Sequence, residues 1–243
     1  MMREVVTRFG RENLGALWLV AEPMIFTLGV TTLWTVGGLN HGGTGMPIVA
    51  FAVTGYSSVL LWRNCANHSL GAIDSNSALL YHRNVKVFDV LLTRSVLEIA
   101  GASGSYAILA TSFTLLGWMS WPVDLLQVLF GWILLAWFGT AVAFVIGAGT
   151  AYSEIVERLW GPTSYLLFPL SGAAFMVDWL PPALQKVVLL IPMVHGLEIM
   201  REGYFGNTVR THYDVGYFVI CCMVLSLFGM YLVRDAGNRV NSR

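Results

Sequence analysis

Six stretches of the chain contain no Asp, Glu, Lys, Arg or His, and this feature constrains the fold more than any other. A helix needs roughly 20 apolar residues to cross the hydrocarbon core of a bilayer, and most of these stretches approach or exceed that length. The chain is 56% apolar and only 12% charged, whereas a soluble domain has about 25% charged residues. We therefore predict an all-α membrane protein with six transmembrane helices. The predicted spans are residues 24–39, 46–62, 99–121, 125–151, 163–177 and 215–233.

A seventh apolar segment, residues 183–194, is too short to cross a membrane. It contains Lys186 and Pro192 and follows two consecutive prolines. Proline interrupts regular helix, and open backbone at membrane depth is tolerated only against protein or a water-filled cavity. We expect a re-entrant helical hairpin between spans five and six, within an extracytoplasmic segment formed by residues 178–214.

The first residues form an amphipathic pattern. Arg8 and Arg11 occupy positions where a cleavable signal peptide would have its apolar core. Apolar residues recur at steps of three and four on the other side of the same helix. We expect residues 1–22 to form an interface helix along the membrane surface until Pro23 lets the chain turn inward. Residues 23–243 would then form a single six-span domain.

The basic residues predict the orientation of the chain. If both termini are cytoplasmic, every Lys and Arg except Lys186, Arg201 and Arg210 falls on the cytoplasmic side. This asymmetry follows the positive-inside rule. We therefore expect a multi-pass protein with both termini in the cytoplasm.

The predicted spans hold no side chain that could couple transport to ions or perform chemistry. Proton- and sodium-coupled carriers place Asp, Glu or His near the membrane midplane. The histidines fall in predicted loops without an HExxH motif, and no GxxxxGK[ST] motif for ATP phosphates occurs. We expect no catalytic residue, metal site or cofactor in this chain and, with a net charge of zero, no nucleic acid as partner. A carrier that uses backbone carbonyls stays open, but active transport would otherwise need energy from another chain.

Residues 63–98, between the second and third predicted spans, are polar and far longer than the roughly 2–8 residues of an ordinary helix connection. A short amphipathic helix is predicted around residues 71–82, with Asp74 among the residues that could cap a second helix. The segment fits a solvated loop on the lipid headgroups and a docking element for a cytoplasmic motor about equally well.

The last part of the predicted hairpin carries polar residues at helical spacing. After Pro192, His195 and Glu198 fall on one helical face together with Arg201 or Glu202. One interpretation is an exposed ion-pair cluster, which is the more common case for such spacing. The other is a polar collar at the mouth of a canal, with Pro192, His195, Glu198 and Arg201 forming an extracytoplasmic gate.

Aromatic residues in the spans exceed what membrane interfaces need. Trp132 and Trp137 lie near mid-depth of a predicted span, where an aromatic belt does not explain them. Aromatic faces stack on sugar rings, although packing is the commoner role for any one of them. Trp132, Trp137, Tyr56 and Phe168 are our candidates for lining a canal.

Two motifs resemble a known family. RFGRENLGALWLVAEP at residues 8–23 and PMVHGLEIMREGYF at residues 192–205 resemble the two signature motifs of permease subunits of ABC transporters that export capsular polysaccharide or O-antigen. The resemblance is nearest to the KpsM-like permeases of Gram-negative capsule exporters. With the six spans it covers essentially the whole chain, and neither motif identifies a particular sugar.

This resemblance implies partners that the sequence alone does not show. They are a second copy of the chain, two cytoplasmic ATP-binding subunits that would bind ATP and Mg²⁺, a periplasmic adaptor of the polysaccharide co-polymerase type, and an outer-membrane channel. The implied cargo is a lipid-linked polysaccharide, which is exported across the bacterial inner membrane to the periplasm.

The resemblance also implies roles for particular segments. The amino-terminal helix and residues 63–98 would contact the ATPase, and the Pro-rich segment would form re-entrant helices that gate the periplasmic mouth. The residues expected to couple the chain to the ATPase are Arg8, Arg11, Asp74 and Arg83. Two alternatives remain: a passive channel or membrane assembly scaffold, and an ABC exporter of another cargo such as a lipid or a drug.

Overall fold

Every regular element in the described part of the chain is a helix. The computed structural model describes residues 15–37, 46–80 and 85–241, and it contains helices α2 to α11 with two short 3-10 turns. The prediction of an all-α protein is confirmed. Because residues 1–14 lie outside the described residues, the interface helix predicted for residues 1–22 stays a prediction over most of its length.

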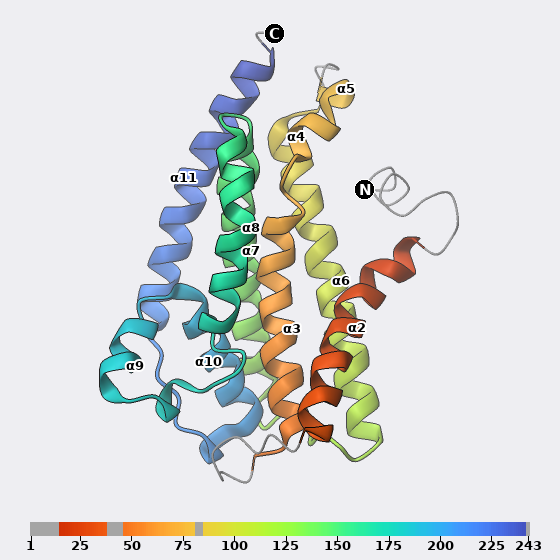
Figure 1. The fold of residues 1–243 in the computed structure, drawn as a ribbon, viewed down its shortest axis with the longest axis vertical. Helices are drawn as coiled ribbons and strands as arrows, with labels where there is room; N and C mark the ends of the chain where they lie inside the picture. Colours follow the sequence, from red (N-terminus) through yellow and green to blue (C-terminus); the bar gives the residue numbers. More distant parts are fainter. Residues whose placement is uncertain (1–14, 38–45, 81–84, 242–243) are drawn as a thin grey trace.

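Six long helices run side by side along the molecule (Figure 1). Each overlaps one predicted span, but length and apolar character single out four of them, α2, α6, α7 and α11, as able to cross a membrane. A fifth span is possible if the bent pair α9 and α10 is counted as one. α3 is more polar, and α8 is shorter, so a total of six spans stays a prediction. The long helices are α2 (Gly15–Val36), α3 (Ile48–Asn67), α6 (Val87–Leu115), α7 (Leu125–Thr150), α8 (Glu154–Leu170) and α11 (Val215–Asn241).

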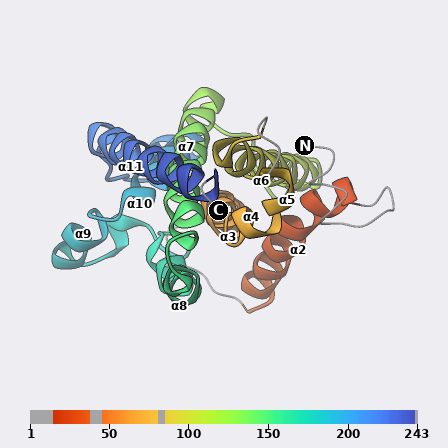
Figure 2. The same ribbon diagram turned by 90° about the horizontal axis from the view of Figure 1, so that it is seen from above.

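Helix α3 is the central element of the bundle. It is buried almost continuously from Ala50 to Trp62, and it packs against α2, α6 and α7, which surround it in the end-on view (Figure 2). Gly139 of α7 makes one of these contacts close, because a Cβ there would lie 2.7 Å from the Cα atom of Trp62. Small residues at such positions let membrane helices approach each other.

Helix α2 does not end at Pro23, and Figure 1 shows its first turns inclined to the rest of the helix. α2 begins at Gly15 and continues through Pro23 to Val36. Pro23 has no N–H to bond the carbonyl of Leu19, and a membrane helix tolerates this loss where neighbouring groups compensate for it. The hydroxyl of Thr27 donates to the carbonyl oxygen of Pro23 itself at 2.9 Å, which is the usual bond of a helical threonine to the residue four positions before it. The described helix therefore crosses the boundary that we expected between residues 22 and 23.

Two other helices begin earlier than the predicted spans. α6 begins at Val87 rather than at residue 99, so it takes in the last part of the predicted coupling loop. The backbone N–H of Lys86 donates to Asp89 Oδ2 at 2.9 Å, which starts the helix. α8 begins at Glu154 rather than at residue 163, with the Ser153 hydroxyl accepting the N–H of Ile155 at 3.1 Å. A search for uncharged residues ends a span at the first charge, whereas a helix continues past it.

The Pro-rich segment forms two helices that meet at a sharp angle. α9 (Pro182–Val188) and α10 (Pro192–Phe205) are bent by 108°. A proline opens each of them, where its missing N–H would have had no helical partner. The predicted break at Pro192 is confirmed, and the arrangement is that of a broken span or a re-entrant loop.

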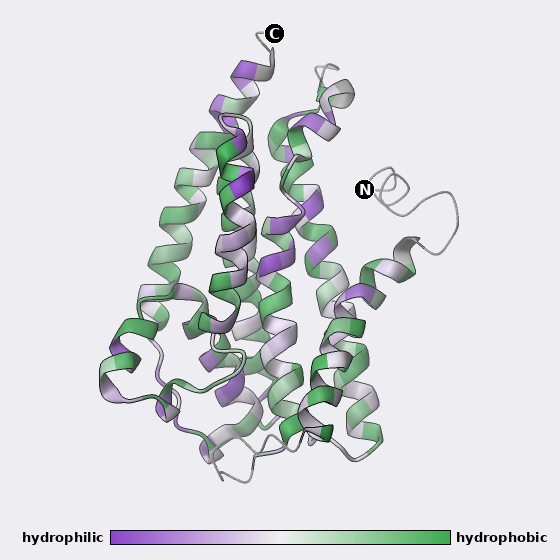
Figure 3. Ribbon diagram, in the orientation of Figure 1, coloured by the Kyte–Doolittle hydropathy of each residue, from purple (hydrophilic) through white to green (hydrophobic). Residues whose placement is uncertain are grey.

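The two ends of the bundle differ in their number of basic residues. One end carries the short helices α4 (Ala72–Ser75) and α5 (Ser77–Leu80) and the carboxyl end of α11, and the other carries α9 and α10 (Figures 1 and 3). We call them the basic end and the α10 end. In the described part of the chain, Arg63, Lys86, Arg94, Arg158, Arg234 and Arg239 belong to the basic end, and Lys186, Arg201 and Arg210 to the α10 end.

Candidate functional site

The polar side chains of the late motif are buried. His195, Glu198 and Arg201 are 3%, 1% and 0% exposed. Helix α10, which carries them, lies against α7 at Gly131, where a Cβ would come within 2.9 Å of the α10 backbone. The interpretation of an exposed ion-pair cluster is therefore wrong. His195 also lies within a helix rather than in the loop that we expected.

Arg201 ties three segments together. Its Nη1 donates to the carbonyl oxygens of Gly172 and Phe175 at 2.8 and 2.6 Å. Its Nη2 donates to the carbonyl oxygen of Ala173 at 2.9 Å. The guanidinium carbon lies 4.0 Å from the ring centroid of Phe51 on α3. The side chain therefore supplies hydrogen bonds to the carbonyl oxygens of the turn after α8 and holds that turn against α10 and α3.

Glu198 holds two backbone N–H groups in the same region. Its Oε1 accepts the N–H of Val177 at 3.4 Å, and its Oε2 accepts the N–H of His212 at 3.1 Å. The first lies on the path from α8 to α9, and the second on the path from α10 to α11. The carboxylate thus links the chain before the bent pair to the chain after it.

His195 makes an equivalent link. Its Nε2 lies 2.8 Å from the carbonyl oxygen of Leu189, and its Nδ1 lies 2.9 Å from the backbone N–H of Asp214. These partners require the neutral ring with its proton on Nε2. Together with Glu198 and Arg201 it forms what we call the α10 anchor. Pro192 begins the helix that presents all three.

Two of the four canal-lining candidates meet. The rings of Tyr56 on α3 and Phe168 on α8 lie 5.6 Å apart between centroids. The ring contacts continue from Tyr56 edge-on to Trp34 at 5.3 Å and from Trp34 to the stacked ring of Phe51 at 6.1 Å. This aromatic stripe, Phe168, Tyr56, Trp34 and Phe51, joins α8, α3 and α2 and ends beneath Arg201.

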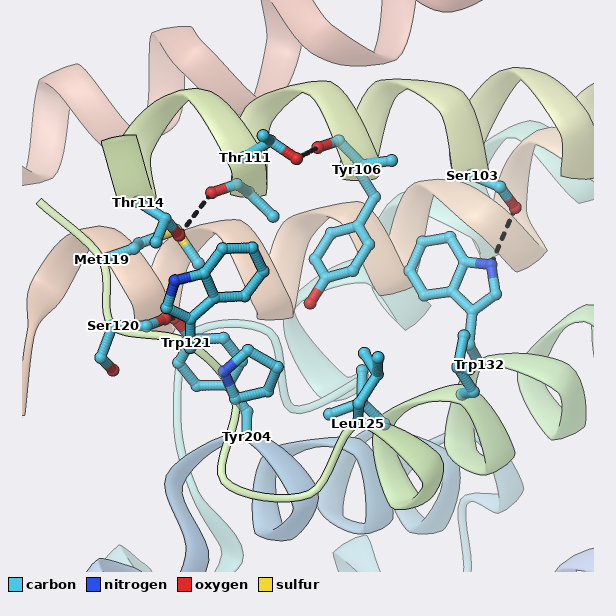
Figure 4. A pocket seen from close by; sticks show the side chains of 15 residues that line it. Ser103, Tyr106, Thr111, Thr114, Met119, Ser120, Trp121, Leu125, Trp132 and Tyr204 are labelled. Atoms are coloured by element: carbon cyan, nitrogen blue, oxygen red, sulfur yellow. Dashed lines mark hydrogen bonds between the residues drawn. The ribbon is translucent and has the colours of Figure 1, made fainter. Parts of the chain in front are cut away.

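Trp132 faces a different region. Its indole N–H donates to the Ser103 hydroxyl at 2.9 Å, and its ring stacks on Tyr106 at 4.9 Å. It lines a cavity of about 390 Å³ between α6, α7 and the end of α10. Figure 4 shows the Tyr106 hydroxyl pointing into this cavity. α6 and α8 lie on opposite sides of α3 (Figure 2), so this cavity does not share a wall with the aromatic stripe.

Trp137 also points away from the stripe. Its indole N–H donates to the Ser226 hydroxyl on α11 at 2.9 Å. A satisfied indole between two helices is typical of packing. The structure therefore brings Tyr56 and Phe168 together and places Trp132 and Trp137 at two other helix contacts.

The basic end contains a buried charged group that we did not predict. Arg94 and Glu98 of α6 are 9% and 5% exposed. Arg94 donates to the His68 carbonyl oxygen at 2.9 Å and to the Ser75 hydroxyl at 2.8 Å. Glu98 Oε1 lies 2.8 Å from His68 Nδ1. Sequence reasoning treated these charges as loop residues, although the spacing of Arg94 and Glu98 by four was a signal for one helical face.

Asp74 is exposed in α4, next to this group. The predicted amphipathic helix around residues 71–82 is present as two short helices, α4 and α5, that break at Asn76. Arg94 attaches α4 to α6 through Ser75, so the segment is held against the bundle. The other three coupling candidates, Arg8, Arg11 and Arg83, lie outside the described residues.

A tyrosine at the basic end joins the turn between α7 and α8 to α11. The Tyr152 hydroxyl donates to Asp235 Oδ2 at 2.6 Å, and the Arg239 guanidinium lies 4.4 Å from the Tyr152 ring centroid. Desolvation and this carboxylate raise the pKa of Tyr152 to about 12. The hydroxyl therefore stays protonated as a donor at physiological pH.

The sequence is similar to a known protein family and to several known proteins. Residues 1–205 match the model for the family described as ABC-2 type transporter. The capsule polysaccharide export inner-membrane protein CtrC of Neisseria meningitidis serogroup B is 42% identical over 233 residues, which are 96% of this chain and 88% of that protein.

Two further relatives have similar coverage. The capsule polysaccharide export inner-membrane protein BexB of Haemophilus influenzae is 39% identical over 235 residues, 97% of this chain and 88% of that protein. The polysialic acid transport protein KpsM of Escherichia coli is 27% identical over 240 residues, 96% of this chain and 90% of that protein.

Proposed function

The chain belongs to the ABC-2 type transporter family, and we propose that it is the transmembrane permease subunit of an ATP-driven exporter of capsular polysaccharide. The observation that carries this proposal is 42% identity over 96% of the chain to a capsule polysaccharide export inner-membrane protein. The location that follows is the bacterial inner membrane, and the cargo is a lipid-linked polysaccharide that moves to the periplasm.

The family implies an ATP-binding partner. We propose two cytoplasmic ATP-binding subunits, which bind ATP and Mg²⁺, on a pair of permease chains. The basic end carries most of the described Lys and Arg residues, and the positive-inside rule favours a cytoplasmic location for such an end. Both termini would then be cytoplasmic, and the α10 end would face the periplasm, toward an adaptor of the polysaccharide co-polymerase type and an outer-membrane channel.

The coupling surface is proposed for the segment between α3 and α6. Asp74 is exposed there while the neighbouring Ser75 is bonded to Arg94, so a force on α4 would reach α6 directly. Arg8, Arg11 and Arg83 complete the proposed surface. Tilting of packed helices by an ATPase stroke would shift the balance between closed and open canals.

The gate is proposed for the bent pair α9 and α10, with Pro192, His195, Glu198 and Arg201 as its support. Buried groups cannot line an aqueous mouth in this conformation. They hold the bent pair to the turns before α9 and after α10. The gate would therefore open by movement of α9 and α10 as one rigid body and not by rotation of single side chains.

The canal is proposed to run past Phe168 and Tyr56, between two copies of the chain. Their rings are in tilted contact, and Tyr56 is only 7% exposed, so the canal would open there only when α8 moves away from α3. Weak contacts of many sugar faces with such rings would permit sliding. The contacts of Trp132 and Trp137 favour packing roles for these two candidates.

Co-purification tests the proposed function. The tagged chain is extracted gently from its host, and the co-purifying proteins are identified by mass spectrometry and assayed for ATP hydrolysis. We expect a near one-to-one partner with a Walker motif. A clean chain in several detergents would contradict the proposal and favour a channel or scaffold.

A charge reversal tests the coupling surface in the same assay. Asp74→Arg is expected to leave the chain in the membrane but to lower the amount of bound ATPase or to uncouple its hydrolysis from export. Lys186→Glu, a reversal on exposed α9 at the opposite end, is the matched control and should bind the ATPase normally. Normal export by Asp74→Arg would move the coupling surface elsewhere.

A further inference from the structure

Arg63 stands out among the basic residues of the described chain because only aromatic rings contact its charge. It lies near the end of α3, one turn before Asn67. Its guanidinium carbon is 4.9 Å from the ring centroid of Tyr165 and 5.4 Å from that of Phe168, both on α8. Within the described residues, no carboxylate forms an ion pair with it and its Nε is buried without a hydrogen-bond partner.

The other arginines of the helices have different surroundings. Arg94 and Arg201 donate to carbonyl or hydroxyl oxygens through their terminal nitrogens, although the Nε of Arg201, like that of Arg63, is buried without a partner. Arg158 pairs with Glu154 at 3.1 Å. A half-buried cation without a counter-charge is unfavourable at the edge of a membrane, and such residues are usually retained for function.

The part of α8 that contacts Arg63 is open to the outside of the bundle. A Cβ placed on Gly161, one turn before Tyr165 on α8, would meet nothing within 4 Å. Tyr165 itself is 71% exposed, so the ring that contacts the guanidinium borders an open region. Nearby, the Trp160 indole N–H donates to Asn67 Oδ1 at 2.8 Å. α3 and α8 are therefore fixed to each other independently of Arg63.

The guanidinium of Arg63 is suited to bind an anion. A guanidinium presents donors in a planar fork that matches the oxygens of phosphate and carboxylate. Rings on one side hold its plane by cation–π contact, which leaves donor edges for a ligand. Phe168 contacts Arg63 and also belongs to the aromatic stripe, so the canal proposed at Phe168 would pass Arg63 at the basic end.

We propose that Arg63, held by Tyr165 and Phe168, is a binding site for an oxyanion of the exported molecule at the basic end of the bundle. The oxyanion is a phosphate of its lipid anchor or an acidic group of its glycan. The identity of the molecule rests on the proposed function, whereas the presence of the anion site does not.

Two soluble probes test the site without knowledge of the cargo. The purified full chain in phosphatidylcholine nanodiscs is titrated with hexyl phosphate and, separately, with oligosialic acid, by isothermal titration calorimetry; empty nanodiscs measure partition. We expect saturable binding of at least one probe and a roughly tenfold to hundredfold weaker affinity for Arg63→Gln, the range for one charged hydrogen-bonded contact. Binding of hexyl phosphate alone would indicate the lipid phosphate, and binding of oligosialic acid alone the glycan.

Three variants separate an anion site from a structural clamp. Arg63→Lys keeps the charge and should retain part of the affinity. Tyr165→Leu keeps the guanidinium but loses one ring, so it should weaken binding less than Arg63→Gln; equal losses would indicate a clamp. Arg158→Gln removes an exposed arginine at the same end and should bind like the unmodified chain.

The proposal is overturned if neither probe saturates, or if Arg63→Gln binds both probes like the unmodified chain. A strain that lacks this chain and still exports its capsule would contradict the proposed function. That result would not affect the measured dependence of probe binding on Arg63. Failure of the proposed export function can therefore be distinguished from failure of the proposed anion site.

Discussion

Arg201 and Arg63 occupy opposite ends of the bundle and show two uses of a cation in a membrane protein. Arg201 is fully buried and donates to three carbonyl oxygens of the turn after α8. Arg63 is partly exposed, and among the described residues its guanidinium contacts only the rings of Tyr165 and Phe168. Both also lie over aromatic rings, so the difference is in the oxygen partners.

We therefore assign Arg201 a structural role and Arg63 a role in ligand binding. A cation whose terminal donors are satisfied within the chain fixes one arrangement of the backbone. A cation without oxygen partners in the described part of the chain can donate hydrogen bonds to the oxygens of a ligand. The α10 anchor is therefore expected to determine stability, and the α3–α8 face is expected to determine what the protein binds.

Removal of the Arg201 side chain should have the largest effect. Arg201→Met leaves three buried carbonyl oxygens without a donor, each of which costs about 1–3 kcal/mol when unsatisfied. We expect the free energy of unfolding in mixed detergent micelles to fall by about 3 kcal/mol or more. An unchanged free energy of unfolding would show that the anchor does not hold the α10 end together.

A glycine beside the anchor should have an intermediate effect. A Cβ at Gly55 would lie 2.6 Å from the Ala173 carbonyl oxygen and 2.9 Å from Arg201 Nη2. Gly55→Ala should therefore lower the free energy of unfolding by about 1–3 kcal/mol, the usual range for overpacking. Gly29→Ala is the control, because a Cβ there meets nothing within 4 Å. It should be neutral or stabilise α2 by about 0.5–1 kcal/mol, and equal effects at both sites would contradict the close contact.

The substitution of Arg63 should have the smallest effect on stability. Arg63→Gln removes a partly exposed cation–π contact, which contributes about 0.5–1 kcal/mol at such sites. Unfolding in the same micelles should therefore differ by less than about 1 kcal/mol from the unmodified chain, while export of polysaccharide falls. A loss of stability as large as that of Arg201→Met would remove the distinction between the two arginines.

The sequence predicts the elements that depend on local chemistry. Uncharged stretches locate the six long helices, and Pro192 marks the start of α10. The starts of α6 and α8 are missed, because caps at Lys86 and Ser153 begin these helices outside the apolar stretches. α2 continues through Pro23, because a proline inside a membrane helix need not end it where neighbouring groups compensate for the lost bond, and hydropathy does not report this.

The site is predicted less completely because burial depends on tertiary contacts. The spacing of His195, Glu198 and Arg201 correctly places them on one helix, but the sequence favours exposure for such a cluster. Their partners are backbone groups between residues 172 and 214, which no spacing rule brings together. Similarly, Tyr56 and Phe168 meet only because α8 folds back along α3.

Capsule localisation tests the central claim most directly. Polysaccharide is measured inside the cells and on the surface in a strain that lacks this chain, and again after the unmodified chain is restored. The account predicts that surface polysaccharide is lost while polysaccharide accumulates inside, and that restoration reverses both. Unchanged surface polysaccharide in the strain without the chain would contradict it.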